Sequence, residues 1–182
     1  MNHTDHVSLL RGGVATPDGV WADLGSGAGA FTLALADLLG ATGAIYSVDQ
    51  DASALAVQKQ AMRRSFPSAA INYLAADFTK PLSLPPLEGV VMANSLHFHR
   101  AKESIVQLVR SYLKPGGRLI LVEYDTDHGN RWVPYPLSFQ TWHALARNCG
   151  FADTRLLATV PSRFLGRIYS ALSLNQEERS HD

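Results

Sequence analysis

The stretch Val20–Ala30 reads VWADLGSGAGA, and it decides the fold class of this chain. Its first half is apolar except for Asp23, as expected of a buried strand in a parallel sheet. Its second half carries Gly25, Gly27 and Gly29 at alternate positions and leads into a helical pattern. Glycines in a turn between a strand and a helix let the backbone bend tightly and approach a ligand closely. The stretch therefore predicts a cradle for a nucleotide-type cofactor at the start of a helix.

The position of Asp23 bears on which cofactor this turn would hold. Gly25-x-Gly27-x-x-Ala30 satisfies the loose fingerprint of dinucleotide-binding turns, so the glycines alone do not decide. A carboxylate at the end of the strand would repel a pyrophosphate, because two unit charges 4 Å apart interact by roughly 4 kcal/mol at an effective dielectric of 20. The same carboxylate would attract an ammonium or sulfonium group, and S-adenosylmethionine carries both. Asp23 thus favours S-adenosylmethionine over NAD, unless its side chain only caps the following turn.

Composition and charge limit the class of protein. The 182 residues include 16 basic and 16 acidic side chains, so no overall field draws the chain to nucleic acid or to an anionic membrane. Cys149 is the single cysteine, which excludes an internal disulfide. The N-terminal residues lack the pattern of a signal peptide, and no apolar run approaches the length of a membrane span. We expect one cytoplasmic domain over residues 1–182, with a short lead-in at 1–19 and a polar tail at 175–182.

An acidic residue closes the second predicted strand, Ala44–Asp49. Asp49 lies 22 residues after Gly27, where doubly wound nucleotide-binding folds place a carboxylate that binds ribose hydroxyls. The alternative is that Asp49 or Asp51 caps the predicted helix at 52–65. Asp51 suits that cap better, which leaves Asp49 free for a ligand.

The third predicted strand, Ile71–Ala76, ends at a pair of residues suited to adenine. The carboxylate of Asp77 would accept a hydrogen bond from the exocyclic amine, and Phe78 would cover one face of the ring. Alternatively, Asp77 begins a turn and Phe78 belongs to the core. Three prolines between residues 79 and 89 argue against a long helix in the crossover that follows.

The rest of the chain continues the alternation of strands and helices. We expect a helical turn at 7–10 and a strand at 89–93, followed by a helix with Ile105, Leu108, Val109 and Tyr112 on its buried side. A turn at 114–117 leads to a central strand at 118–124. The next helix, at 138–149, has Phe139, Trp142, Leu145 and Ala146 inward and Gly150-Phe151 as its cap, and strands follow at 154–160 and 168–174. The short loop between the last two strands permits only antiparallel pairing.

Five motifs, in this order and spacing, resemble those of the class I S-adenosylmethionine-dependent methyltransferases. They are Asp23-Leu-Gly-Ser-Gly-Ala-Gly, Asp49, Ala76-Asp77-Phe78, Asn94-Ser95-Leu96-His97 and Leu113-Lys-Pro-Gly-Gly-Arg-Leu. The chain looks most like small-molecule methyltransferases of the kind that includes the ubiquinone and menaquinone biosynthesis enzymes. The resemblance implies an α/β fold with a Rossmann-like, doubly wound, seven-stranded sheet that is mostly parallel and has an antiparallel last strand. It also implies S-adenosylmethionine as cofactor. The balanced charge argues against a nucleic-acid or membrane partner, so we expect a small-molecule acceptor by elimination. We expect no metal.

The resemblance assigns roles to residues of this sequence. Asp23, Gly25, Gly27 and Gly29 would hold the methionine part of the cofactor, Asp49 and Gln50 the ribose, and Asp77 and Phe78 the adenine. Asn94 and its neighbours would line the site beside the methionine part and the sulfonium. The N-terminal region, which often supplies a substrate lid in this family, is short here. The acceptor site would then be open, closed by a second copy in a homodimer, or covered by the loop at 125–137.

Methyl transfer needs a base only where the acceptor atom must lose a proton. The candidates at strand ends are His97, His99, Glu123, Tyr124, Asp125 and His128. We favour His97 on the substrate side because it follows the motif that lines the cofactor; alternatively it is an ordinary polar residue at a strand end. A metal site built from His97, His99, Asp125 and His128 is the disfavoured alternative, because no third ligand in range is evident.

The unusual loop after the central strand offers a further acceptor contact. Arg131 and Trp132 could clamp a flat or anionic acceptor, or Trp132 and Tyr135 could simply pack the loop onto the sheet. Three functions stay open at this point. They are methyl transfer to a small molecule, cofactor binding without chemistry, and NAD-dependent oxidoreduction, for which the chain lacks a Tyr-x-x-x-Lys pair.

Overall fold

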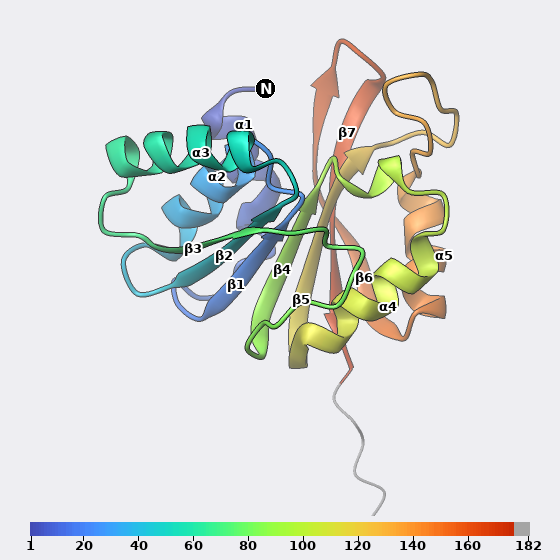
Figure 1. The fold of residues 1–182 in the computed structure, drawn as a ribbon. Coiled ribbons are helices and arrows are strands. Elements are labelled where there is room, and N and C mark those ends of the chain that lie inside the picture. The colour runs from blue at the N-terminus through green and yellow to red at the C-terminus, as the bar shows by residue number, and fades with distance from the viewer. Residues whose placement is uncertain (177–182) are drawn as a thin grey trace, which may run out of the picture.

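The computed structural model describes residues 1–176. Its elements, in chain order, are α1 (His3–Arg11), β1 (Val20–Leu24), α2 (Ala30–Leu39), β2 (Ala44–Asp49), α3 (Ala52–Ser65), β3 (Ala70–Ala75), β4 (Leu87–Ala93), the 3-10 turn η1 (Leu96–Phe98), α4 (Lys102–Tyr112), β5 (Leu113–Tyr124), α5 (Phe139–Asn148), β6 (Phe151–Ser162) and β7 (Gly166–Asn175). The strands form a single sheet with helices on both faces (Figure 1).

The seven strands follow the order β3-β2-β1-β4-β5-β7-β6. The first five strands of this order are mutually parallel. β7 pairs antiparallel with both β5 and β6, and the hairpin between β6 and β7 has the tight connection that this pairing requires. The predicted α/β, doubly wound, seven-stranded fold with an antiparallel last strand is therefore confirmed.

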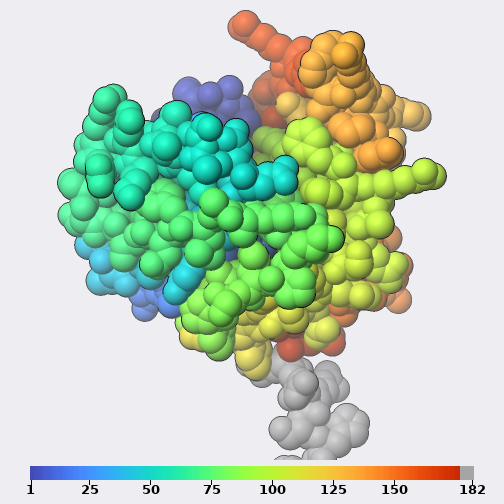
Figure 2. Space-filling model, in the orientation of Figure 1, coloured from blue at the N-terminus to red at the C-terminus, as the bar shows by residue number. Residues whose placement is uncertain are grey.

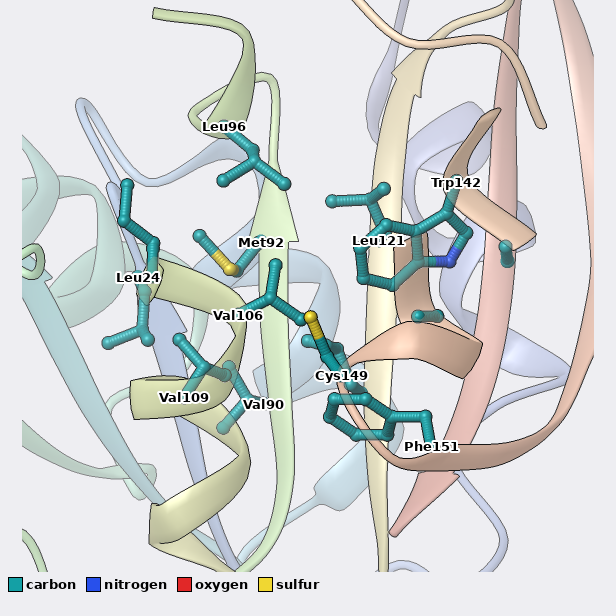
Figure 3. Packing of buried hydrophobic residues seen from close by; sticks show 14 of the residues in the cluster. Leu24, Val90, Met92, Leu96, Val106, Val109, Leu121, Trp142, Cys149 and Phe151 are labelled. Carbon is teal, nitrogen blue, oxygen red and sulfur yellow. The ribbon is translucent and has the colours of Figure 1, made fainter. Parts of the chain in front are cut away.

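The two faces of the sheet bury separate hydrophobic clusters. Along β4 the neighbours Val90 and Val91 are both fully buried but belong to different clusters, since successive side chains of a strand point to opposite faces. One cluster packs against α1 and α2, and the other packs against α4 and α5. In the second cluster, Trp142 of α5 and Met92 of β4 lie over the middle of the sheet (Figure 3). This coverage explains why β1, the second half of β4 and residues 119–122 of β5 are largely apolar.

The N-terminal segment forms a longer helix than the sequence pattern predicts. α1 starts at His3, because Asn2 and Asp5 form a reciprocal capping box. Leu9 and Leu10 are fully buried in the cluster that α1 shares with α2. The predicted lead-in thus contributes a helix to the core.

Most predicted elements are confirmed, some with shifted ends. β3 starts and ends one residue earlier than predicted, and β4 starts two residues earlier, at Leu87. In α4 the buried side chains are Ile105, Val106 and Val109, whereas Leu108 and Tyr112, which the pattern placed inward, are partly exposed. The crossover from β3 to β4 contains no helix in the described chain, as its prolines predicted.

Two predicted boundaries near the ends of β5 and β7 are wrong. The residues at 114–117, predicted as a turn, lie within β5, where the pairing with β4 shifts register between Leu87 and Gly89 and Gly116 has a positive φ of 73°. Asn175, predicted to begin a polar tail, ends β7 instead. Its amide group donates to the carbonyls of Leu113 and Lys114 and accepts from Arg110. The remainder of the predicted tail, from residue 177, lies outside the described residues.

Candidate active site

The turn after β1 contains three glycines whose surroundings differ. All three have a positive φ, at 78° for Gly25, 52° for Gly27 and 90° for Gly29. A residue with a Cβ adopts such a backbone conformation only at a cost in free energy. A Cβ on Gly25 would overlap Ser95, and one on Gly29 would overlap Gln58, so both positions are limited by packing. A Cβ on Gly27 would meet nothing within 4 Å. Gly27 is therefore the position where a ligand can approach the backbone.

The carboxylate of Asp49, at the end of β2, holds this turn. Its Oδ2 accepts a 2.7 Å hydrogen bond from Gly27 N–H, and its Oδ1 accepts from Asp51 N–H. Asp51 itself caps α3 by accepting from Ser53 and Ala54 N–H. The cap therefore belongs to Asp51, as predicted, and Asp49 stands at the mouth of the glycine turn with Gln50 beside it.

Asp77 and Phe78 follow β3 on the same side of the sheet. Asp77 accepts from the N–H and the hydroxyl of Thr79, and these hydrogen bonds hold the pKa of its carboxyl below the usual value. Phe78 is 9% exposed, and its ring meets that of His99 edge to face at 5.3 Å. The structural alternative is confirmed, because Asp77 starts a turn and Phe78 joins the core. Both residues also line a cavity, and their contact with adenine stays a prediction.

Asn94 follows β4 and has an unusual backbone conformation. Its φ is 52°, one of two positive values at residues other than glycine in the described chain. Its N–H donates to Val122 of β5, and its side-chain Oδ1 is buried without a hydrogen-bond partner among residues 1–176. An unsatisfied buried acceptor is costly and calls for a donor from outside the chain.

These residues enclose one cavity of about 420 Å³ at the carboxyl ends of the parallel strands. It is lined by Gly25, Gly27, Asp49, Gln50, Ala76, Asp77, Phe78, Asn94, Ser95, Phe98 and His99. The lining contains two carboxylates and no lysine or arginine, so it suits a cationic ligand better than a phosphorylated one.

A buried histidine–glutamate pair lies beside this cavity. His97 Nδ1 lies 2.7 Å from Glu123 Oε2, and His97 N–H donates to Glu123 Oε1 at 3.1 Å. The exposed fractions are 3% for the His97 side chain and 0% for that of Glu123. His97 does not itself line the cavity, whereas its neighbours Phe98 and His99 do. A carboxylate at Nδ1 fixes the ring orientation and directs the lone pair of the neutral ring to Nε2.

A family described as a methyltransferase domain matches residues 16–159. The chain belongs to this family. It is 30% identical over 105 residues to the ubiquinone/menaquinone biosynthesis C-methyltransferase UbiE of Erwinia tasmaniensis, covering 57% of this chain and 41% of the relative. It is 29% identical over 108 residues to the hybrid PKS-NRPS synthetase fsa1 of a Fusarium strain, covering 48% of this chain and 3% of the synthetase. The chain therefore spans less than half the length of these curated relatives.

A solved structure supports the fold of this methyltransferase domain. The YcgJ protein from Bacillus subtilis superposes with a TM-score of 0.79 at 12% identity, covering 96% of this chain and 100% of the other. The resemblance predicted from the five motifs is thus confirmed at the level of the family.

The methyltransferase cavity brings together most of the predicted cofactor residues, but two of them lie outside its lining. Gly29 packs against Gln58. Asp23 is 1% exposed, and its Oδ2 accepts a 2.6 Å hydrogen bond from Thr32 of α2. Burial raises the pKa of Asp23 to about 7, with the nearby charge of Asp49 adding to the effect. A contact between Asp23 and a bound cofactor stays a prediction, and the carboxylates that reach the cavity are Asp49 and Asp77.

Sequence reasoning missed several residues of this site. Phe98 and Ala76 line the cavity without having been assigned to it, whereas Ser95 is one of the neighbours of Asn94 that the resemblance placed there. Glu123 and His97 were separate candidates for a base, and their pairing was not predicted. The signal was present, because Glu123 is the one acid inside the otherwise apolar stretch at 119–124.

Of the other base candidates, His99 lines the cavity and Asp125 takes a structural role. Asp125 pairs with Arg167 and accepts from Phe139 N–H at the start of α5. Within residues 1–176 no group of three or more histidine, cysteine, aspartate or glutamate side chains is placed to hold a metal ion. No helix in that range is long and apolar enough to cross a membrane.

Proposed function

We propose that this methyltransferase domain binds S-adenosylmethionine in the 420 Å³ cavity and transfers its methyl group to a small-molecule acceptor whose reacting atom loses a proton. The observation that carries the proposal is the buried pair of His97 and Glu123 next to the cavity. A methyl transfer to an atom that is already a free nucleophile needs no base. A buried carboxylate that orients a histidine is the arrangement expected where a proton must be removed.

The cofactor fits the polar groups of the cavity. The orphaned Oδ1 of Asn94 would accept from the ammonium group of the methionine part. Asp49, with Gln50, would accept from the ribose hydroxyls, and Asp77 from the adenine amine, with Phe78 against the ring. Gly27 leaves the open space that a close backbone contact requires. Asp23, which is buried below the turn, would attract the ammonium group of the methionine part. Gly25 and Gly29 would allow the backbone conformation of the turn.

When bound, S-adenosylmethionine supplies a methyl group that its sulfonium already activates, so the chain contributes position and proton removal. His97 Nε2 would take the proton from the acceptor. The carboxylate of Glu123 would stabilise the imidazolium that forms, through its 2.7 Å contact with Nδ1.

Calorimetry tests the cofactor assignment. S-adenosylmethionine should bind the wild-type chain, and NAD should not. Asp49→Ala should lose most of the affinity, because the variant lacks the ribose acceptor and the bond that holds Gly27. Asp18→Ala, which removes an exposed carboxylate near the start of β1, is the matched control. Binding of NAD, or unchanged affinity in Asp49→Ala, would contradict the assignment.

An acceptor screen that follows release of S-adenosylhomocysteine tests the base. Among phenols, enols and thiols, His97→Gln should lower turnover of the phenolic and enolic acceptors by about 10²- to 10⁴-fold while leaving cofactor affinity unchanged. Glu123→Gln should lower the same rates and change their pH profile. His143→Gln, on the exposed face of α5, should have no effect. A chain that binds the cofactor but releases no product with any acceptor would instead be a binding module.

The structure leaves two further sequence predictions as proposals. A homodimer would close the open acceptor side, and light scattering of the purified chain measures that state. A cytoplasmic location was expected because the sequence lacks a signal-peptide pattern and a long apolar run. Fractionation of cells that produce the chain tests it.

A further inference from the structure

A run of aromatic rings beside the cofactor cavity joins the buried ring of His97 to exposed rings on the surface. The ring of His97 lies 4.3 Å from that of Phe98 and 6.1 Å from that of Tyr124. Tyr124 lies 5.9 Å from Phe164, which lies 6.1 Å from Trp132. We call these five side chains the aromatic run. Such centroid distances are those of interacting aromatic pairs.

Four separate segments supply the aromatic run. Phe98 and His97 come from η1, Tyr124 from the end of β5, Trp132 from the loop between β5 and α5, and Phe164 from the tip of the β6–β7 hairpin. The loop and the hairpin tip lie side by side at the top of the molecule in Figures 1 and 2. Four segments that converge on one set of rings indicate a site, since isolated exposed apolar residues need no explanation.

Three of these rings remain open to solvent. The exposed fractions are 57% for Phe98, 67% for Trp132 and 49% for Phe164. The rings meet at interplanar angles of 63° and 77° along the outer part of the run, so they stand edge to face and leave faces free. A free aromatic face suits a flat, conjugated ligand.

The aromatic run is continuous with the proposed reaction site. Phe98 both lines the cofactor cavity and contacts the ring of His97. An acceptor lying along the run would therefore reach the cavity and His97 at its inner end. Its outer end would lie against the exposed faces of Trp132 and Phe164.

We propose that the aromatic run binds the ring system of a planar aromatic acceptor that carries an ionisable hydroxyl group at its inner end. The proposal rests on the proposed function, because it takes His97 to be the base. In this proposal the exposed rings determine the class of acceptor, and Trp132 and Phe164 select for flat acceptors.

Trp132 offers a direct readout of binding. The chain has three tryptophans, and the other two, Trp21 and Trp142, are 2% and 0% exposed. In ¹⁵N-labelled protein saturated with S-adenosylhomocysteine, 2-naphthol should shift the indole N–H signal of Trp132 saturably and leave the other two in place. The saturated analogue decahydro-2-naphthol should bind at least about tenfold more weakly, because it lacks the flat face.

Variants locate the binding surface. Phe164→Leu and Phe98→Leu should each weaken binding of 2-naphthol by about two- to tenfold, since each keeps an apolar side chain but removes a ring. Leu156→Ala, at a 47% exposed apolar position on β6 outside the run, should bind 2-naphthol as the wild type does. The two Phe→Leu variants also check that the ligand lies along the run and does not shift the Trp132 signal from elsewhere.

Two results would overturn the proposal. Equal affinity for the flat and the saturated compound would mean a generally apolar surface, and no shift of the Trp132 signal at millimolar 2-naphthol would mean that the run serves another partner. These results are distinguishable from failure of the proposed function. If His97→Gln kept full turnover while 2-naphthol still bound the run, the base assignment would fail and the aromatic acceptor surface would stand.

Discussion

At the scale of single residues, one short turn shows how three glycines can look equivalent in sequence and differ in function. Gly25 and Gly29 are confined by the side chains of Ser95 and Gln58, and Gly27 faces open space. Packing therefore explains two of the glycines, and we expect that ligand access explains the third.

Substitution by alanine should separate these roles. Gly29→Ala should lower the free energy of unfolding more than Gly27→Ala, because it adds an overlap with Gln58 to the cost of a positive φ, itself about 1–2 kcal/mol. Gly27→Ala should instead lower the affinity for S-adenosylmethionine. Urea unfolding and calorimetry on both variants measure the two effects. Equal losses of stability in the two variants would contradict this division of roles.

Asp23 should make stability depend on pH. Its pKa is raised by burial from 3.8 to about 7, so the folded chain binds this proton more tightly than the unfolded chain does. The contribution is fully present below about pH 4 and is lost as the pH rises through 7, with a slope of up to about 1.4 kcal/mol per pH unit.

The control is a variant that mimics the protonated acid. Asp23→Asn should flatten this part of the pH profile between pH 5 and 7.5, while Asp18→Asn, at an exposed position, should leave it as in the wild type. Chemical unfolding at a series of pH values provides the measurement. A wild-type profile that rises over this range would mean that other groups dominate.

At the scale of elements, sequence periodicity predicted the type and order of nearly every helix and strand, because each element buries a recognisable face. The ends were less predictable where a tertiary contact sets them. β5 begins at Leu113 because β4 offers it a partner at Leu87, and β7 extends to Asn175 because carbonyls of β5 accept from its amide. Neither contact can be read from local pattern.

The helix α1 gives a test at this scale. Leu9 is 0% exposed in the cluster shared with α2, so Leu9→Ala should lower the free energy of unfolding by about 2–5 kcal/mol. Val57→Ala, at a 58% exposed position on α3, should change it by less than about 0.5 kcal/mol. Urea unfolding compares the two. If both variants matched the wild type, the N-terminal helix would not be part of the cooperative core.

At the scale of the whole molecule, the sheet order gathers the site from residues that are far apart in sequence. The carboxyl ends of parallel strands meet at one edge of the sheet. The position of Asp49 and Asp77 at strand ends was therefore sufficient to predict that both line one cavity. The pairing of His97 with Glu123, and the burial of Asp23 against Thr32, depend on how side chains turn within the assembled fold. The lone acid in the stretch at 119–124 marks Glu123 as a buried group that needs a partner, but it does not say which side chain that partner is.

Ligand-linked stability tests the assembled site. S-adenosylmethionine at 100 times its dissociation constant should add about 2.7 kcal/mol to the free energy of unfolding. For a chain of this length, that corresponds to a rise in melting temperature of roughly 5–10 °C. NAD at the same concentration should leave the melting temperature unchanged. A larger shift with NAD would reverse the cofactor assignment.

The hydrogen bond from Gly27 N–H to Asp49 Oδ2 has a consequence for the rate of cofactor binding. The loop that would receive the cofactor is already braced by the chain's own hydrogen bonds, including those from Gly25 and Ser26 N–H to Val48. Little entropy remains to be lost there on association. Capture of the cofactor should then proceed in a single rapid phase whose rate rises linearly with concentration, without a slow rearrangement afterwards.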